Sequence, residues 1–381
     1  MTQDRAYPEP RRLYIGIELS ASKWGLAFSH GGSRIRHTSM APGDARDLKE
    51  KIATYLRKEK LPDGTQVVTC YEAGRDGFWV HRFLTSLGIQ NIVIDAASMK
   101  VNRRFRRVKN DRVDATQLVL DLIRYYRGEK DVWSIVRVPT EEQEDDRRDH
   151  RSLERLKKER TQHRARVLSL LATQGIPSPT HFGTFLKNLD EAKTWNGQPL
   201  PPGLKAELER ERERLQVVEN QKRGIERKQE EALEDPSTPA MKKVQRLAML
   251  RGIGKDSAWL MVMEFFSWRD FRSRREVGGA AGLGGTPYSS GATEREQGIS
   301  KSGNPRVRHR AVELGWQWLR LQPQSELSEW YKRRFAEGGA RRRRAGIVAL
   351  ARRLLIALWH FVEHGVIPKG AVLKPIPVVV G

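Results

Sequence analysis

The chain has 381 residues, which is enough for two or three domains of ordinary size. It carries 70 Lys and Arg against 47 Asp and Glu, so its formal net charge is +23 and the surface repels itself unless an anionic partner neutralises it. The single cysteine, Cys70, excludes an intramolecular disulfide and a cysteine-based zinc site. The sequence contains no run of 18 apolar residues, so no membrane-spanning helix is predicted. Nucleic acid is therefore the first partner that the composition suggests.

Residues 11–130 are predicted to form an α/β domain. The predicted strands, in chain order, are 13–19, 24–28, 33–38, 66–72 and 91–95. The predicted helices are 44–58, 77–87 and 113–126. The alternation of helices and strands after the first three strands predicts parallel strands with covered faces. In a sheet with this strand order, the first and fourth strands are neighbours.

Two helical segments follow. Residues 140–236 are predicted to form an antiparallel coiled-coil hairpin, because heptad-spaced apolar residues flank a Pro-rich middle at 174–202. Residues 240–366 are predicted to form a mostly α-helical domain with a Gly-rich interior, and the tail after Pro368 is predicted to be a loose extension. Arg251-Gly-Ile-Gly resembles the turn of a helix-hairpin-helix element, where small residues let backbone amides approach a phosphate. An ordinary helix–helix turn is the alternative.

Basic residues gather in two regions, the stretch at residues 103–112 and the part of the chain from Arg251 onward. From Arg251 to the end there are 23 Lys and Arg against 11 Asp and Glu, an excess that is half of the total. A charged run is usually a solvated surface, but these clusters adjoin carboxylates that would otherwise repel a phosphate backbone. The candidate nucleic-acid-binding residues are Arg103, Arg104, Arg106, Arg107, Lys109, Arg112, Arg251, Lys255, Arg295, Lys301, Arg306, Arg341, Arg342, Arg343 and Arg344.

Four carboxylates stand out by position. Glu18 lies inside the first strand, where a charge is costly unless it is paired or binds metal. Glu72 ends the fourth strand, and Asp111 and Asp114 lie three apart at a helix start, hence on one face. We expect the four to converge at one sheet edge, where hard oxygen ligands suit Mg²⁺ or Mn²⁺. Taken singly, Glu72 fits a strand-end charge and Asp111 a helix N-cap, and Asp95 is a reserve candidate.

A second candidate site is the pair Ser289 and Ser290 within the Gly-rich stretch. One interpretation is a flexible turn. The other is an exposed hydroxyl nucleophile, with Arg295, Lys301 and Arg306 nearby in the sequence to neutralise a phosphoryl group. A serine needs a base or a metal to activate it.

Together these motifs resemble those of the DEDD transposases of the insertion-sequence 110 family, which are bridge-RNA-guided recombinases. The N-terminal part of the match is Tyr14-Ile-Gly-Ile-Glu-Leu-Ser-Ala-Ser-Lys and Lys109-Asn-Asp-Arg-Val-Asp-Ala. The C-terminal part is Arg251-Gly-Ile-Gly, Ala281-Gly-Leu-Gly-Gly-Thr-Pro, Ser290-Gly and Gly298-Ile-Ser-Lys-Ser-Gly-Asn304. The last block is the most specific, and the motifs cover nearly the whole chain in the family's order.

The resemblance implies an N-terminal RuvC-like domain with the RNase H fold, whose metal ligands would be Glu18, Glu72, Asp111 and Asp114. It implies a serine that attacks DNA and forms a phosphoserine link, which maps best to Ser290, with Ser289 as the adjacent alternative. The implied partners are a bridge RNA, target and donor double-stranded DNA, and further copies of the chain in a homodimer or homotetramer. The implied location is the bacterial cytoplasm, on the nucleoid, without a membrane.

The sequence departs from the family in two places. The family has Asp where this chain has Glu18, so the carboxylate is one methylene longer, and the Pro-rich stretch at 174–202 is an additional feature. Two other functions stay open. One is a RuvC-like nuclease that uses metal-activated water and leaves free ends. The other is a noncatalytic nucleic-acid-binding relative.

Overall fold

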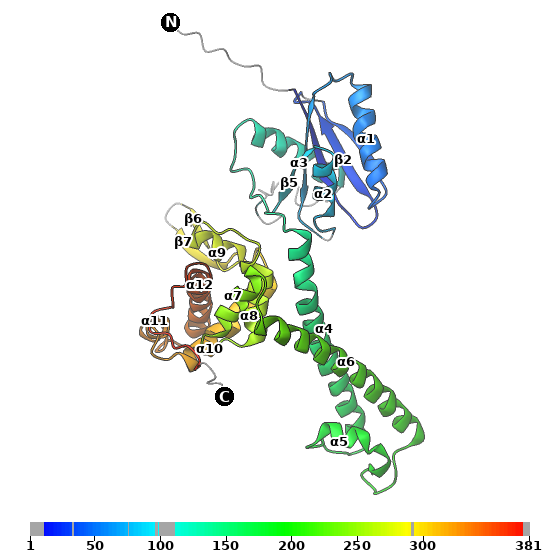
Figure 1. Ribbon diagram of the computed structural model, residues 1–381, viewed down its shortest axis with the longest axis vertical. Helices are drawn as coiled ribbons and strands as arrows, with labels where there is room; N and C mark the ends of the chain where they lie inside the picture. The colour runs from blue at the N-terminus through cyan, green and yellow to red at the C-terminus, as the bar shows by residue number, and fades with distance from the viewer. Residues whose placement is uncertain are drawn as a thin grey trace. The chain divides into compact units, whose positions relative to one another are not determined.

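The computed structural model describes residues 11–32, 34–74, 76–95, 98, 111–290 and 293–375, without the side chains of 111–112, 287–290 and 293–297. The chain divides into two compact units, Met1–Pro139 and Thr140–Gly381 (Figure 1). The first unit is mixed α/β around one sheet, and the second is mostly helical. This confirms the predicted combination of an α/β N-terminal part with a helical C-terminal part.

The first unit contains a five-stranded sheet in the order β3-β2-β1-β4-β5. Its strands are β1 Arg12–Glu18, β2 Trp24–Ser29, β3 Arg36–Met40, β4 Gln66–Glu72 and β5 Gln90–Ile94. Its helices are α1 Ala45–Lys58, α2 Trp79–Ser86 and α3 Asp111–Tyr126. β1, β2 and β3 are antiparallel, whereas β1, β4 and β5 are parallel, so the expected pairing of the first and fourth strands is confirmed.

The two faces of the sheet are covered by different helices. Side chains alternate along β1, so Leu13, Ile15 and Ile17 join the core that holds the buried residues of α1 and α2. Tyr14 faces the other way and joins the core that α3 supplies. Between them Gly16 lets α3 lie directly on the strand, because a Cβ there would stand 2.7 Å from the Ala115 carbonyl oxygen.

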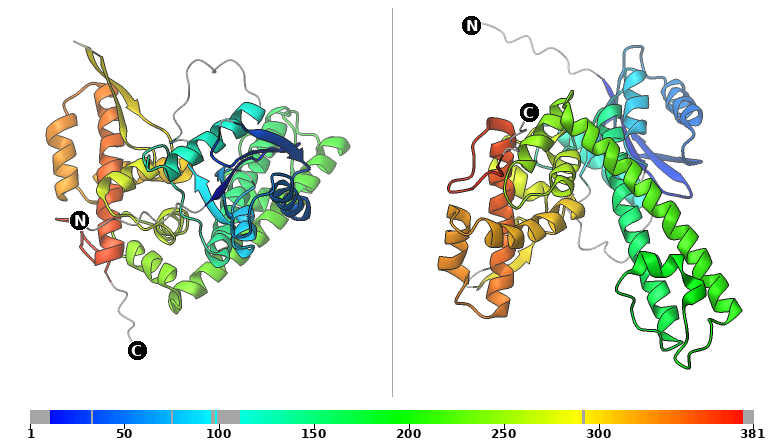
Figure 2. Two further views of the ribbon diagram at one scale, coloured as in Figure 1. Left: turned by 90° about the horizontal axis from the view of Figure 1, so that it is seen from above. Right: turned by 60° about the horizontal axis from the view of Figure 1, so that its bottom comes forward.

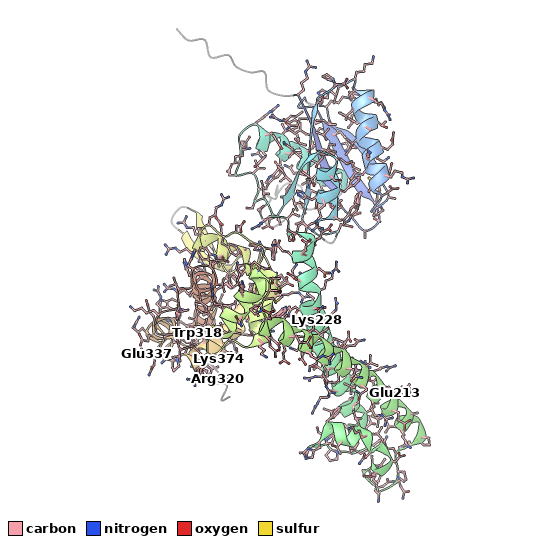
Figure 3. All side chains as sticks on the ribbon, in the orientation of Figure 1. Glu213, Lys228, Trp318, Arg320, Glu337 and Lys374 are labelled. Atoms are coloured by element: carbon pink, nitrogen blue, oxygen red, sulfur yellow. The ribbon has the colours of Figure 1, made fainter. Side chains whose placement is uncertain are left out.

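In the second unit, two long helices form the helical hairpin. They are α4 Glu141–Ala172 and α6 Pro202–Glu234, joined by α5 Phe182–Lys187 and a 3₁₀ turn at Leu189–Glu191. Ion pairs Arg160–Glu219 and Lys228–Asp149 show that α4 and α6 run antiparallel, side by side as Figure 2 shows. Figure 3 labels Lys228, a residue of α6. The Nζ of Lys228 lies 2.6 Å from the Asp149 carboxylate.

The rest of the second unit is a helical domain with its own core. Its helices are α7 Pro239–Ala248, α8 Lys255–Met261, a π-helical segment Val262–Phe266, α9 Arg274–Ala280, α10 Pro305–Leu321, α11 Glu326–Phe335 and α12 Ala340–His364. Among the described residues α12 alone is long and apolar enough to cross a membrane by length and composition, and 56% of its most apolar window is buried inside the protein.

Residues 369–375 of the C-terminal tail are docked, unlike the predicted loose extension, and residues 376–381 lie outside the described residues. The backbone amide of Arg251 donates to the Val372 carbonyl at 3.1 Å, and the Gln322 side chain bonds both backbone groups of Val372. The Lys374 ammonium, labelled in Figure 3, donates to the carbonyls of Ala248 and Ile253 at 2.6 and 2.7 Å. The end of α7 leaves backbone carbonyls without helical partners, and this tail satisfies them.

Candidate functional site

Two of the predicted acids lie side by side at one edge of the sheet. Glu18 is the last residue of β1 and Glu72 the last of β4. The two strands are parallel and Ile17 pairs with Tyr71, so the acids follow one another in register at the carboxyl ends of adjacent strands. Adjacent strands lie about 4.8 Å apart. Both acids are half-buried, so the backbone brings two carboxylates together at a site that water reaches.

Both acids belong to the sheet face that α3 covers. Each follows by two residues a position in contact with that helix, Gly16 in β1 and Cys70 in β4. The Cys70 thiol lies 3.5 Å from the carbonyl oxygen of Leu118 in α3. Because successive strand residues alternate between faces, Glu18 and Glu72 project toward the side of α3.

The direction of α3 decides which of its ends meets the acids. Tyr126, in its last turn, packs on Tyr14 near the start of β1, with ring centroids 5.9 Å apart. Ala115, in its first turns, lies against Gly16, further along β1. The helix therefore runs antiparallel to β1, and its first turn lies toward the carboxyl end of the strand.

That first turn carries the two predicted aspartates. Asp114 is half-buried and lies four residues before the buried Leu118, so it extends the sheet-facing stripe of α3 by one turn. Asp111 is the first residue of α3, four before the buried Ala115, and its side chain lies outside the described residues. The described side chains contain no group of three or more His, Cys, Asp or Glu that could hold a metal ion.

Part of the predicted basic cluster cannot be placed. Arg103, Arg104, Arg106, Arg107 and Lys109 lie outside the described residues, and Arg112 is described only as a backbone position in α3.

The serine pair lies in a β-hairpin within the Gly-rich stretch, where a flexible turn was one of the two interpretations. The strands are β6 Gly285–Ser290 and β7 Thr293–Ile299, and they are antiparallel. Ser289 pairs with Glu294, and Ser290 pairs with Thr293. Ser290 is thus the last residue of β6 and belongs to the final strand pair, a position that places it at the tip of the β-hairpin.

The base of the β-hairpin is held by backbone packing that only glycine permits. Gly282 has φ +67°, and a Cβ on it would stand 1.9 Å from the Ser302 carbonyl oxygen. Gly303 has φ +95°, and its Cβ would stand 2.2 Å from the Ala280 carbonyl oxygen. The Gly298-to-Asn304 motif therefore has a visible structural role, which is to close the base.

Of the three predicted phosphate-neutralising cations, Lys301 and Arg306 lie away from the serine, whereas Arg295 is a diagonal cross-strand neighbour of Ser290. Five residues of β6 separate Ser290 from the base, about 17 Å at ~3.4 Å per residue. Lys301 and Arg306 lie at the base, and Arg306 is ion-paired with Glu154 of α4. Arg295 lies within β7, opposite Tyr288.

A polar network that sequence reasoning missed anchors this base. Asn304 caps α10 through its Oδ1, and its Nδ2 donates to the Glu264 carboxylate at 3.1 Å. Glu264 is 1% exposed in the π-helical segment, and Arg151 of α4 donates to both of its oxygens at 2.6 and 2.9 Å. Burial alone would raise the pKa of Glu264, but the hydrogen bonds from Arg151 and Asn304 lower it overall. π-Helical turns are frequent at functional sites.

His150 lies beside this network. It is 2% exposed, and its Nε2 lies 3.8 Å from Glu154. Burial lowers the pKa of His150 to about 4, against the opposing effect of the Glu264 charge. The imidazole is therefore neutral at physiological pH.

The remaining predicted cations lie on the surface of the second unit. Arg341–Arg344 form the exposed first turn of α12, where the positive helix end adds to their charge. Arg251 is exposed in the turn between α7 and α8, where Gly252 has φ +92°, a conformation common to helix-terminating turns of either predicted kind. Lys255 begins α8 and pairs with Glu230 at 3.1 Å.

Comparisons with known proteins place the chain in a family. Residues 244–331 match the model of the IS116/IS110/IS902 transposase family. The chain is 38% identical to y4rJ of Sinorhizobium fredii, a protein named as a transposase, over 95% of this chain and 94% of that protein. It is 29% identical to the transposase for insertion sequence element IS1328 of Yersinia enterocolitica, over 57% of this chain and 63% of that one. It is 24% identical to the transposase for IS1533 of Leptospira borgpetersenii, over 70% and 73%. The protein belongs to the IS110 family of transposases.

Proposed function

We propose that this transposase is an RNA-guided DNA recombinase that cuts and exchanges strands through a serine nucleophile. The observation that carries the proposal is the position of Ser290 at the tip of a β-hairpin whose base is anchored by the Glu264 network. We also propose that the first unit is an RNase H-like, RuvC-like domain. Its strand order, with three antiparallel strands followed by two parallel ones, supports that assignment.

The proposed cofactor is Mg²⁺ or Mn²⁺. Glu18 and Glu72 meet at adjacent strand ends, with the first turn of α3 and Asp114 on the same face, so the donor set is all carboxylate, as these ions prefer. Asp111 would complete the set from the same turn. A bound ion would neutralise the charge that develops on phosphate oxygens during strand transfer. The extra methylene of Glu18 changes where its carboxylate lies, which this donor set must accommodate.

In the proposed step the Ser290 hydroxyl oxygen attacks a backbone phosphorus. A phosphoserine bond forms, the bond to the leaving deoxyribose oxygen breaks, and that oxygen takes up a proton. The protein thus keeps the energy of the broken phosphodiester in a covalent link, and a new strand end reverses the reaction. Ser289 at the neighbouring strand position is the alternative nucleophile.

The proposed partners are a bridge RNA and target and donor double-stranded DNA, bound by a homodimer or homotetramer in the bacterial cytoplasm. The basic surface of the second unit supports this, since Arg341–Arg344 are all exposed. If a guide RNA carries the sequence information, the protein needs to bind backbone and shape only. Purified protein should therefore retain RNA at low salt, and a sample free of RNA would count against guidance.

The test compares Ser290→Ala with Ser289→Ala and the wild-type protein on labelled element DNA. Ser290→Ala should abolish the covalent protein–DNA adduct seen on denaturing gels while it leaves RNA binding intact. Adducts at the wild-type level in Ser290→Ala would overturn the role of Ser290. Asp111→Asn and Asp114→Asn should lose activity, and excess Mg²⁺ should restore part of it if these residues act through metal affinity.

The same gels test the second candidate function, a RuvC-like nuclease. It is kept because the two adjacent strand-end carboxylates are a feature that metal-activated water could also use. A water nucleophile leaves free DNA ends, whereas a serine nucleophile leaves protein attached. A noncatalytic relative would bind DNA with a steep salt dependence and would not cut it, whichever metal is added.

A further inference from the structure

The helical hairpin contains a pocket far from the residues proposed for catalysis in the second unit. Its volume is about 760 Å³, and α4, α5 and α6 all contribute to its walls. We call it the hairpin pocket. Its cationic lining residues are Arg160, Arg164, Lys187, Arg212 and Arg223. The apolar part of the lining consists of Phe182, Leu186 and Leu215.

The charge of the hairpin pocket differs sharply from that of its surroundings. Residues 141–235 carry 19 Lys and Arg against 20 Asp and Glu, so the segment as a whole is almost neutral. The pocket lining has five cations and one carboxylate, Glu219. A neutral segment that gathers cations from three helices around one cavity has separated its charges, which a merely soluble surface does not need to do.

Four of the five cations form no direct ion pair with a described carboxylate. Arg160 reaches Glu219 at 3.5 Å, the long end of an ion pair. Among the described residues, Arg164, Lys187, Arg212 and Arg223 form no ion pair within 4.0 Å, although the helices around them are rich in carboxylates. Arg212 also acts on a carboxylate, since the pKa of Asp190 is lowered mainly by Lys205 and further by the charge of Arg212. The positive charge of the pocket is therefore only partly neutralised from within.

The pocket also offers an aromatic surface. The Arg164 guanidinium lies over the Phe182 ring at 4.4 Å from its centroid. A guanidinium plane and an aromatic ring are the two surfaces on which unstacked bases are bound, and flanking cations track the phosphates. The hydroxyls of Thr161 and Thr184 add hydrogen-bonding groups to the lining.

We propose that the hairpin pocket binds a single-stranded stretch of nucleic acid, with phosphates on Arg212 and Arg223 and a base near Phe182. The proposal relies on the proposed function only in taking nucleic acid as the polymer. It adds a site in the central helices, outside the basic clusters that the sequence indicates. An acidic peptide is the competing ligand, and the aromatic surface favours the nucleic acid over it.

The experiment uses the full chain, stripped of bound nucleic acid at high salt. The probes are a fluorescein-labelled oligouridine and the matching oligothymidine, and their affinities are measured by anisotropy over a range of salt concentrations. The pocket variant is R212Q/R223Q. The matched control is R210Q/R227Q, which removes the same charge from the same helix outside the pocket. The variant R212K/R223K keeps the charge.

We expect R212Q/R223Q to weaken binding about tenfold at physiological salt, and to reduce the salt slope by about 1.4 if two phosphate contacts are lost. R210Q/R227Q should stay near the wild type, and R212K/R223K should retain most of the affinity. Ultraviolet cross-linking of oligouridine should label the peptide that contains Phe182, and R212Q/R223Q should remove that label. Equal affinities of the two glutamine variants, with no cross-link at Phe182, would overturn the proposal.

Two further outcomes identify the ligand. A preference for oligouridine or for oligothymidine tells RNA from DNA, and either supports the proposal. Displacement by polyglutamate as effectively as by an oligonucleotide of equal charge would contradict it, because the pocket would then bind any polyanion. These readouts measure binding, so they are independent of the adduct test, and loss of the Ser290 role would leave them unaffected.

Discussion

Arg151 donates two hydrogen bonds to Glu264, from Nε to Oε1 at 2.6 Å and from Nη2 to Oε2 at 2.9 Å. The pair joins helix α4 to the π-helical segment of the C-terminal helical domain, across 113 residues of sequence. Glu264 also accepts from Asn304, which starts α10 just after the β-hairpin. The geometry of the proposed nucleophile thus depends on a buried carboxylate far from it in sequence.

Glu264→Gln should destabilise the protein and impair strand exchange. The change keeps the shape but leaves Arg151 without its counter-charge, a loss of roughly 3–5 kcal/mol for fully buried pairs. Because the Arg151 side chain is 41% exposed, solvent screens part of that, and we expect about 2 kcal/mol from urea unfolding. Glu329→Gln, at an exposed pair on α11, should cost less than about 0.5 kcal/mol. Equal effects of the two changes would contradict a structural role for the network.

The stability of the protein should fall between pH 6.5 and pH 4 because of His150. Its pKa is lowered by burial to about 4, so the unfolded chain binds a proton in this window and the folded protein does not. Stability is therefore highest above pH 6.5 and decreases as the pH falls, by an amount on the order of 3 kcal/mol. In His150→Leu the free energy of unfolding should change much less with pH across that window. A curve as steep as that of the wild type would show that other groups cause the decrease.

A lower pH window belongs to Glu211 of α6. This carboxylate is 1% exposed and accepts hydrogen bonds from His163, Arg166 and Arg214. Burial opposes ionisation, but these bonds lower the pKa of Glu211 to about 2. The stabilisation that Glu211 gives the folded protein is present above the ordinary carboxyl pKa and is lost as the pH falls toward 2. Glu211→Gln should remove that acid-dependent loss, measured by unfolding at successive pH values, and an unchanged acid transition would refute it.

Gly282→Ala and Gly279→Ala form a matched pair near the β-hairpin. Gly282 has a left-handed φ and no room for a Cβ, so alanine should separate the base of the β-hairpin and abolish strand exchange. Gly279 lies in α9, and a Cβ on it would meet nothing within 4 Å, so alanine there should be neutral or stabilising by up to about 1 kcal/mol. Thermal unfolding and exchange assays check both, and a fully active Gly282→Ala protein would overturn the role of the base.

Gly16→Ala tests how α3 positions the acids. A Cβ at Gly16 would stand 2.7 to 2.8 Å from Ala115, Leu118 and Val119, so the helix must move away from β1. We expect a destabilisation of roughly 1–3 kcal/mol and weaker binding of Mn²⁺ by calorimetry. Gly74→Ala, which meets only the Glu72 carbonyl oxygen at 3.8 Å, is the control. Unchanged Mn²⁺ affinity in Gly16→Ala would show that the packing of α3 on β1 does not position the acids.

The sequence predicted most of the first unit because its signals are local. Apolar runs located β1, β2 and β4 within a residue or two, and the alternation of elements predicted that β1 and β4 are neighbours. β3 was predicted at 33–38 but lies at Arg36–Met40. Its partly exposed, polar residues specify the register of an edge strand only weakly. Glu18 and Glu72 stand out because a charge at a buried strand is costly, and the register of β1 and β4 places them side by side.

The C-terminal site was harder to predict because non-local contacts create it. The β-hairpin has serines and glycines where apolar alternation would indicate strands, and its base is set by packing around Gly282. Nothing local connects Arg151 with Glu264.

The docked tail has a consequence for how the protein is made. Lys374 bonds to Ala248 and Ile253, more than 120 residues earlier, so these contacts form only after residue 374 has left the ribosome. Domains tend to fold as they emerge during synthesis, yet the turn between α7 and α8 waits for a segment made more than 120 residues later. A nascent chain that has not reached Lys374 leaves the Ala248 and Ile253 carbonyls without this donor, so this part of the unit forms late in its own synthesis.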